Sequence, residues 1–447
     1  MQRSRNGRLN PTASNGRRQQ GRARQRALLI AASPDAAAGS GSQGRDDHNL
    51  LELRELLRTA GVAGVGEMVQ RRPQPHPNTY LGAGKLDELQ AAIKQVDANL
   101  VACDDELSPR QERNLEAALG VPVIDRTAII LDIFAAHAHT AEGKLQVELA
   151  QLEYNLARMR GLWSHLERLG AGRIDGGIGT RGPGETQIET DRRLARDRIS
   201  SLRRKLSHVR GTRSLMREER ERAHLPQIAL AGYTNAGKST LLNVLTGASA
   251  GVGERLFHTL DPTTRILRHE GRSYLVTDTV GFIRKLPHQL VDAFGATLEE
   301  TRRADLLLHV VDGSAAEEER AAMMAAAQDV LHEIGADEIP QLLVLSKADQ
   351  VDDDRRYELA RRHPGAALVS AHTGEGIESL QERIEQEFAR SLRDVELLIP
   401  YGEGRQLAEL HEIAGDLERE ETSSGVRVKV RLPEPVAARY DRFALSR

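Results

Sequence analysis

The sequence predicts an α/β protein of several domains, and three observations lead to that prediction. Short apolar runs alternate with helical patterns over most of the 447 residues, which is typical of parallel sheets covered by helices. Between residues 142 and 223, apolar residues instead recur with the period of two long helices. A chain of this length can form two to four domains with cores of their own.

Composition limits the class of protein. The single cysteine, Cys103, excludes an internal disulfide and is typical of a reducing cytoplasm. No apolar stretch approaches the length of a membrane span, and the basic N-terminus lacks the apolar segment of a signal peptide. We therefore expect a cytoplasmic protein without a disulfide-linked partner. The net charge of −3 identifies no partner, because charge is unevenly distributed along the chain.

Residues 1–26 are expected to form a disordered basic tail. They contain eight arginines and no acidic residue, and they cannot bury enough apolar area to fold. Two interpretations stay open: a solubilising tail without a partner, and an arm that attracts RNA phosphates through counterion release.

An N-terminal α/β domain is predicted over residues 27–141. Apolar runs at Ala27–Ile30, Leu100–Cys103 and Val121–Ile124 alternate with helical patterns, which indicates a small parallel sheet. Gly82-Ala83-Gly84-Lys85 lacks the leading glycine and the full spacing of a phosphate-binding loop, which favours a helix start at this position.

A helical hairpin with a glycine-rich tip is predicted over residues 142–223. Apolar residues recur with four–three spacing along the first helix, and a complementary stripe follows the second. The face of the second helix outside that stripe is expected to be basic, with Arg193, Arg196, Arg198, Arg203, Arg204, Lys205, Arg210 and Arg217. A solvated face is one interpretation, and a surface for RNA phosphates is the one that the excess of positive charge favours.

The hairpin tip is a candidate RNA contact. Seven glycines fall within residues 170–184, which gives the backbone more freedom than stability requires. A mobile linker is one interpretation. A tip that orders on RNA is the other, with Arg173, Arg181 and Gln187 as its candidate contacts.

The most informative run is Gly232-Tyr233-Thr234-Asn235-Ala236-Gly237-Lys238-Ser239, which directly follows the apolar residues 227–231. Its spacing and its place between a strand and a helix predict a phosphate-binding loop, or P-loop. The glycines let backbone N–H groups turn toward phosphate oxygens. Lys238 is the candidate for the β- and γ-phosphates, and the Ser239 hydroxyl is a candidate ligand of Mg²⁺.

Three further motifs follow in the order that a GTPase requires, each after an apolar run. In Asp278-Thr279-Val280-Gly281, the carboxylate can hold a Mg²⁺-bound water and the Gly281 N–H can sense the γ-phosphate. Asp349 of Ser346-Lys347-Ala348-Asp349 can accept two hydrogen bonds that guanine donates and adenine cannot. Ser370-Ala371-His372 can present backbone N–H groups to the base oxygen. Together these motifs predict a P-loop GTPase domain over residues 224–391 that binds GTP or GDP.

Three other positions of this domain bear on catalysis. A threonine between the first two motifs should close on Mg²⁺, and spacing does not choose among Thr259, Thr263 and Thr264. Phe282 stands where many GTPases place a water-positioning glutamine, so the isolated protein should hydrolyse GTP slowly. Asn235 matches an asparagine with which some GTPases help to hold K⁺, although a simple turn residue is the alternative.

The base motif departs from the usual pattern, because Ser346 replaces the common asparagine. Its shorter side chain should be a weaker brace, and guanine selectivity should be relaxed. After this domain, residues 392–447 are expected to form a small α+β domain, to which the sequence assigns no chemistry.

At several places the chain resembles the HflX family of translation-factor-related GTPases. The most specific match is the run Gly176–Arg193, with supporting matches at Glu142–Gln151, Gly82–Lys85 and Leu260–Thr263. The resemblance covers the chain from about Ala27 to its C-terminus. It implies that the threonine of Phe257-His258-Thr259-Leu260-Asp261 is the Mg²⁺ ligand, which favours Thr259 over its neighbours.

The resemblance also implies a partner. The family binds ribosomes through such a hairpin, so we expect a GTP-hydrolysing switch that binds chiefly the large ribosomal subunit and its RNA, and that splits or rescues stalled ribosomes under stress. A ribosome-assembly GTPase is one alternative, and an RNA-binding scaffold with incidental turnover is another. We expect a monomer that does not bind DNA and that can associate peripherally with a membrane.

Overall fold

The computed structural model describes residues 25–33, 42–158, 183–222, 225–248, 256–257, 259–260, 262–285, 295–390, 392–414 and 417–445. Most of the basic tail, most of the glycine-rich tip with Arg173 and Arg181, and the site residues His258 and Asp261 lie outside these ranges, and so does the side chain of Gln187. The chain divides into two compact units, residues 1–104 with 114–126, and residues 105–113 with 127–447.

The first unit contains a parallel four-stranded sheet of order β2-β1-β3-β4. Its strands are β1 (Arg26–Ser33), β2 (Ala63–Arg71), β3 (Leu100–Cys103) and β4 (Val123–Asp125). The intervening helices are α1 (Ser42–Thr59), α2 (Ala83–Val96) and α3 (Pro109–Leu119). Gly82 is the N-cap of α2, so the Gly82–Lys85 run is a helix start. The parallel sheet that the alternating pattern predicts is confirmed.

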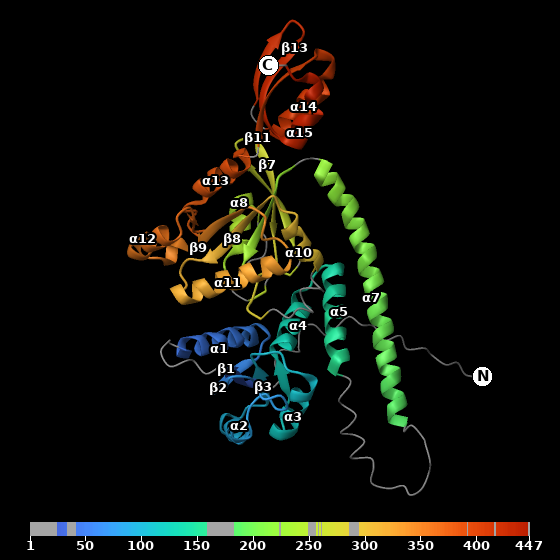
Figure 1. Cartoon of the computed structure of the whole chain (residues 1–447), viewed down its shortest axis with the longest axis vertical. Helices are drawn as coiled ribbons and strands as arrows, with labels where there is room; N and C mark the ends of the chain where they lie inside the picture. Colours follow the sequence, from blue (N-terminus) through green and yellow to red (C-terminus); the bar gives the residue numbers. More distant parts are fainter. Residues whose placement is uncertain are drawn as a thin grey trace, which may run out of the picture. The chain divides into compact units, whose positions relative to one another are not determined.

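Two long helices pack side by side in the second unit (Figure 1). After α4 (Arg126–His137) come α5 (Ala141–Arg158) and α7 (Pro183–Arg222). Their shared apolar cluster consists of Leu149, Ile199, Leu202 and Leu206, with Leu145, Leu152 and Leu156 packed against it. These are residues of the predicted stripes, because a four–three repeat places them on one face of each helix.

Two of the predicted outward-facing cations of α7 instead pair with α5. The Arg198 guanidinium lies 2.6 Å from Glu148, and the Arg203 guanidinium lies 2.7 Å from Glu153. Both arginines flank the apolar seam and remain about half exposed or more, at 48% and 66%. The sequence pattern missed these pairs because the rotation of one helix against the other decides them.

The nucleotide-binding domain predicted from the P-loop has a six-stranded sheet of order β10-β9-β8-β5-β7-β6. The strands are β5 (Gln227–Gly232), β6 (Thr263–His269), β7 (Arg272–Asp278), β8 (Leu306–Asp312), β9 (Gln341–Ser346) and β10 (Ala367–Leu368). All neighbours are parallel except β6, which pairs antiparallel with β7. The helices are α8 (Lys238–Thr246), α10 (Gly295–Arg302), α11 (Glu317–Glu333), α12 (Asp353–Arg362) and α13 (Ile377–Arg390).

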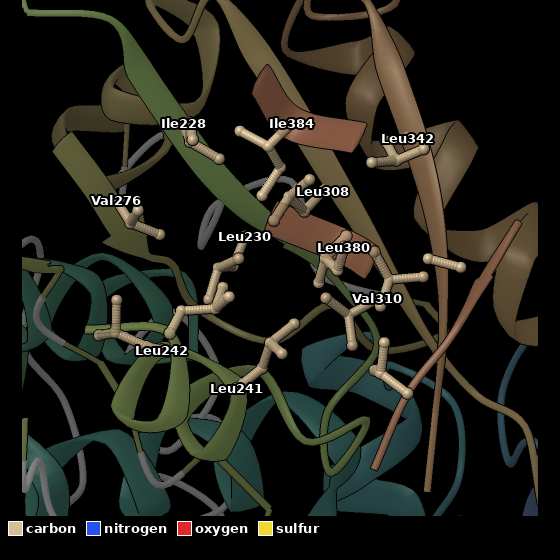
Figure 2. Packing of buried hydrophobic residues seen from close by; sticks show 14 of the residues in the cluster. Ile228, Leu230, Leu241, Leu242, Val276, Leu308, Val310, Leu342, Leu380 and Ile384 are labelled. Atoms are coloured by element: carbon tan, nitrogen blue, oxygen red, sulfur yellow. The ribbon is translucent and has the colours of Figure 1, made fainter. Parts of the chain in front are cut away.

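Apolar side chains on both faces of this sheet form its core. On one face, Leu230, Leu308 and Val310 pack with Leu241 of α8 and Leu380 of α13 (Figure 2). The opposite face carries a second cluster that includes Ala231, Phe282, Leu298, Leu307 and Leu331. Alternate residues of each strand therefore enter different clusters, as the pleat of a strand requires.

The C-terminal part is a three-stranded antiparallel sheet with helices, as the sequence predicts. It comprises β11 (Leu392–Ile399), α14 (Gly404–Ala414), β12 (Glu418–Thr422), β13 (Gly425–Pro433) and α15 (Glu434–Arg439), in the strand order β11-β13-β12. Leu397, Leu410 and Val428 are fully buried in its core. Throughout the described part of the chain, no helix is long and apolar enough to span a membrane.

The helix pair provides the first test. Leu202→Ala should lower the free energy of unfolding by about 2–5 kcal/mol, because it opens a cavity at a fully buried position of the seam. Leu194→Ala is the control on the same helix, since Leu194 is 58% exposed and its removal should change stability by less than about 0.5 kcal/mol. Urea denaturation followed by circular dichroism measures both. Equal effects of the two variants would contradict the packing described here.

Candidate nucleotide-binding site

The P-loop lies between β5 and α8, and its backbone requires glycine. Gly232 has φ 146°, and a Cβ at this position would lie 2.1 Å from the Val310 carbonyl oxygen of β8. Gly237, the N-cap of α8, has φ 88°, and Asn235 between them has φ 61°. Left-handed conformations of this kind turn successive N–H groups to one side and form an anion-binding concavity. The loop therefore has the shape that phosphate oxygens need, at the N-terminus of a helix.

Lys238 is buried at the centre of this loop. Its Nζ donates hydrogen bonds to the carbonyl oxygens of Gly232 (2.9 Å) and Tyr233 (2.7 Å), and only 6% of the residue is exposed. Burial lowers the pKa of the ammonium group to about 8, while the nearby Asp278 carboxylate acts in the opposite direction. A phosphate anion would stabilise the charged form that burial disfavours.

Three oxygen-bearing side chains converge beside Lys238. Ser239 Oγ donates to Asp278 Oδ2 at 2.6 Å and lies 2.8 Å from Thr259 Oγ1. Asp278 is 1% exposed, and its Oδ1 is buried without a hydrogen-bond partner among the described residues. Burial raises the pKa of Asp278, although Lys238 and the Ser239 and Thr259 hydroxyls lower it. The site thus offers two hydroxyl oxygens and a buried carboxylate that has one oxygen without a hydrogen bond in the described part of the chain. Oxygen ligands of this kind fit a Mg²⁺ ion.

The other threonines considered for this position lie in the β6–β7 ladder. Thr263 begins β6, and Thr264 Oγ1 lies 3.0 Å from Thr277 Oγ1 of β7. Thr259 alone of the three has a hydrogen bond to Ser239 in the structure. Its neighbours Phe257 and Leu260 are each 2% exposed, so their side chains contribute packing rather than polar contacts.

The chain after Asp278 runs directly past the P-loop. Thr279 Oγ1 donates to the Leu230 carbonyl at 2.7 Å, and Val280 is buried. At Gly281, a Cβ would lie 2.8 Å from Thr234 Cγ2 and 3.1 Å from Lys238 Nζ. The glycine therefore permits a close approach of the backbone to the phosphate-binding lysine.

Phe282 turns its side chain away from this site. Its N–H donates to the Gly232 carbonyl (3.0 Å), and its own carbonyl accepts from the Thr234 N–H (2.8 Å). The ring is 1% exposed and belongs to the cluster beneath α10 and α11. Because ring and backbone are both held, residue 282 cannot orient a water molecule with its side chain.

The base-recognition motifs meet at the ends of β9 and β10. Ser370 Oγ donates to Asp349 Oδ1 at 2.6 Å and so holds the pKa of this otherwise exposed carboxyl below its usual value. Lys347 Nζ lies 2.5 Å from Asp312 Oδ2 of β8, and the Ala348 N–H donates to the Val369 carbonyl. Ala371 and His372 follow in the turn after Ser370. Asp349 is thus ionised and oriented, as a guanine acceptor must be.

Ser346 contacts the P-loop despite its short side chain. Its Oγ lies 2.7 Å from the Ala236 carbonyl and 3.1 Å from the Val311 carbonyl. The hydroxyl has one proton, and both carbonyl oxygens lie within reach of it. The shorter distance is to Ala236, so the brace between the base motif and the phosphate loop is present. The relaxed guanine selectivity that the sequence predicts from this serine remains a prediction.

Two features of this region were not predicted from the sequence: a role for Asp312, and the contact that the side chain of Tyr233 makes outside the P-loop. Asp312 pairs with Lys347 and also accepts from the N–H and hydroxyl of Ser314, and Tyr233 Oη accepts from the Arg284 N–H. Asp312 could have been found, because it ends an apolar strand as Asp278 does. The partner of Tyr233 lies 51 residues away, and no local pattern indicates it.

The parallel sheet, the P-loop and the ordered motifs at its strand ends define a P-loop GTPase. Family models match three successive parts of the chain: "GTP-binding GTPase N-terminal" at residues 47–135, "GTP-binding GTPase Middle Region" at 137–220, and "50S ribosome-binding GTPase" at 227–347. The protein belongs to the HflX family of GTPases, since GTPase HflX of Caldanaerobacter subterraneus subsp. tengcongensis is 42% identical over 428 residues, covering 95% of each chain. It therefore binds and hydrolyses GTP.

Other relatives agree with this membership. GTPase HflX of Escherichia coli is 44% identical over 401 residues, which is 88% of this chain and 91% of that protein. Among solved structures, a GTP-binding protein from the archaeon Sulfolobus solfataricus in complex with GDP is similar at 24% identity and a TM-score of 0.40, covering 81% of this chain and 98% of that one. Similarity at that TM-score assigns no ligand or partner to this chain.

Nucleotide choice provides the second test. Asp349→Asn should reduce the preference for GTP over ATP by roughly ten- to a hundredfold, because a charged bidentate contact contributes roughly 1.5–3 kcal/mol. Ser346→Ala is the comparison, since it removes the contact with the P-loop and should weaken both nucleotides while changing their ratio little. Equilibrium dissociation constants of GTP and ATP analogues measure both. If the ratio of the GTP and ATP dissociation constants is unchanged in Asp349→Asn, the site with Ser346 did not discriminate between the two bases in the first place.

Proposed function

We propose that this GTPase is a switch that acts on the ribosome, chiefly on the large subunit and its RNA, and that it splits or rescues stalled ribosomes under stress. The observation that carries the proposal is the cationic helix α7, which continues into the GTPase domain after only four residues, from Arg222 to Gln227. A ribosome-bound protein of this kind would act in the cytoplasm.

The charge of α7 supports a nucleic-acid surface. Residues 189–209 include seven cations (Arg192, Arg193, Arg196, Arg198, Arg203, Arg204, Lys205) and three carboxylates (Glu189, Asp191, Asp197). Glu148 and Glu153 of α5 neutralise Arg198 and Arg203. Arg193, Arg196, Arg204 and Lys205 are exposed. An exposed row of cations on a rigid helix suits the phosphate backbone of RNA.

The nucleotide would be held by the groups described above. Backbone N–H groups of residues 232–239 and the Lys238 ammonium would bind the phosphates, and the Gly281 N–H would contact the γ-phosphate. Ser239 and Thr259 would hold Mg²⁺, with Asp278 behind a metal-bound water. The ion would supply charge neutralisation for the phosphates. Asp349 would select guanine, and the residues after Ser370 would face the base oxygen.

One feature supports a slow basal reaction that a partner accelerates. Phe282 is held in the core, so the chain itself offers no side chain at that position to orient the attacking water. The large ribosomal subunit would order the segments around Thr259 and after Asp278, and would supply or position a polar group. Asn235 stands in the P-loop with positive φ, and we include K⁺ as a second ion that this side chain would help to hold.

Thr259 provides the third test. Thr259→Ala should remove most of the extra affinity that Mg²⁺ gives to a GTP analogue, while GDP binding changes little, because only the closed state uses this hydroxyl. Thr264→Ala is the matched control, since its hydroxyl lies against Thr277 in the sheet. Titration with each nucleotide, with Mg²⁺ and after its chelation, gives the comparison. Equal losses of GDP and GTP-analogue affinity in Thr259→Ala would refute its assignment as a switch ligand.

Ribosome stimulation provides the fourth test. GTP hydrolysis should be slow alone and rise strongly with purified large subunits. The double variant Arg196→Glu/Arg204→Glu should lose that stimulation and keep the basal rate, because it reverses exposed charge away from the nucleotide. Arg361→Glu/Arg405→Glu, at exposed positions of α12 and α14, is the charge-matched control and should retain stimulation.

Co-sedimentation with intact ribosomes and with separate subunits completes this test. Full stimulation of Arg196→Glu/Arg204→Glu would show that α7 is a strut rather than an RNA contact. Accumulation of immature subunits in cells lacking the protein, with normal splitting of stalled ribosomes in vitro, would instead favour a role in ribosome assembly.

A further inference from the structure

Tyr233 connects the P-loop with the segment that follows Gly281. Its backbone carbonyl accepts from the Lys238 ammonium at 2.7 Å. Its phenol oxygen accepts from the backbone N–H of Arg284 at 3.0 Å, and the residue is 7% exposed. One P-loop residue therefore contacts both the phosphate-binding lysine and the segment after Gly281.

The Arg284 contact is a second attachment of this segment to the P-loop. At the first, the Phe282 N–H and carbonyl bond to Gly232 and Thr234, the residues on either side of Tyr233. Two residues further along, the phenol oxygen of Tyr233 accepts from Arg284. The backbone of residues 282–284 is thus attached to the P-loop at both ends, and Lys285, with φ 53°, pairs through its ammonium group with Asp105.

We propose that the Tyr233 hydroxyl is a positioning group for GTP hydrolysis: it holds residues 282–284 in register with the P-loop, so that the Gly281 N–H stays at the γ-phosphate. The inference rests on the proposed contact of Gly281 with the γ-phosphate. Packing alone does not require the hydroxyl, because a phenylalanine ring would fill nearly the same volume. With Phe282 in the core, the placement of this backbone adds to what Lys238 and the P-loop N–H groups contribute to organising the reacting phosphate.

Tyr233→Phe tests the proposal by removing one oxygen atom. The single-turnover rate constant of GTP hydrolysis should fall by about tenfold, since one hydrogen bond that positions the reacting group is lost. The dissociation constant of GDP should change by less than about twofold, because the P-loop backbone and Lys238 are retained. The amide of Arg284 should exchange its hydrogen faster, because it has lost its acceptor.

Tyr401→Phe is the matched control. The Tyr401 hydroxyl also bonds to the backbone, at the Thr422 carbonyl in the C-terminal part, and its removal should leave the rate constant and Arg284 exchange unchanged. Thermal unfolding of both variants checks that they fold. An unchanged rate constant in Tyr233→Phe would overturn the proposal, as would parallel losses of GDP and GTP binding with unchanged Arg284 exchange, which indicate a purely structural role.

Gly281→Ala separates this inference from the function on which it rests. If Gly281→Ala weakens binding of a GTP analogue more than binding of GDP, and Tyr233→Phe leaves hydrolysis unchanged, the γ-phosphate contact stands and the role of Tyr233 is refuted. If Gly281→Ala weakens neither nucleotide selectively and neither variant slows hydrolysis, the proposed γ-phosphate contact itself fails.

Discussion

The burial of Lys238 and Asp278 at one edge of a parallel sheet is the constraint on which the rest of this site depends. Each residue is almost wholly inaccessible, and burial shifts the pKa of each toward its uncharged form. Removing charged groups from water is costly unless partners compensate them. Here the compensation is incomplete within the described residues, because Asp278 Oδ1 has no hydrogen-bond partner. Such a site gains from a ligand that brings both an anion and a cation, which is the composition of a nucleotide with its metal.

The path of the backbone around Lys238 and Asp278 is sterically restricted. Val310 of β8 leaves no room for a Cβ at Gly232, and Thr234 leaves none at Gly281. The two glycines let two segments of the chain pass close to Lys238. The hydrogen bonds of the Phe282 backbone with the P-loop, and of the Tyr233 phenol with the Arg284 N–H, hold these segments together. The neutral His309 of β8 belongs to the same buried region, since burial lowers its pKa to about 4 and Lys238 acts in the same direction. A protonated His309 would be a second cation next to Lys238, which is unfavourable, and burial keeps the imidazole neutral.

Features set by nearby residues were predictable from the sequence, and features set by sheet order were not. The P-loop, the strand before it and the helix after it lie within twenty residues, so their pattern predicted them. The contacts of Ser346 with Ala236 and of Lys347 with Asp312 depend on β9 lying beside β8, which in turn lies beside β5. Pairing of Arg198 with Glu148 likewise depends on how two helices are rotated. Apolar patterns of period 3.6 or 2 identify which face of a helix or strand is buried. They do not identify which residue of a neighbouring element contacts that face.

The departure at Ser346 shows how an altered motif can keep its mechanical role. An asparagine can bond through a carbonyl and an amide, whereas serine has one hydroxyl. In this chain the hydroxyl is 5% exposed and lies against two carbonyls, one from the P-loop and one from β8. Because burial makes an unpaired carbonyl costly, this contact stabilises the arrangement of the P-loop against the strand that carries the base motif. Guanine selection then falls to Asp349, whose carboxylate is oriented by Ser370, so bracing and selection are divided between two neighbouring motifs.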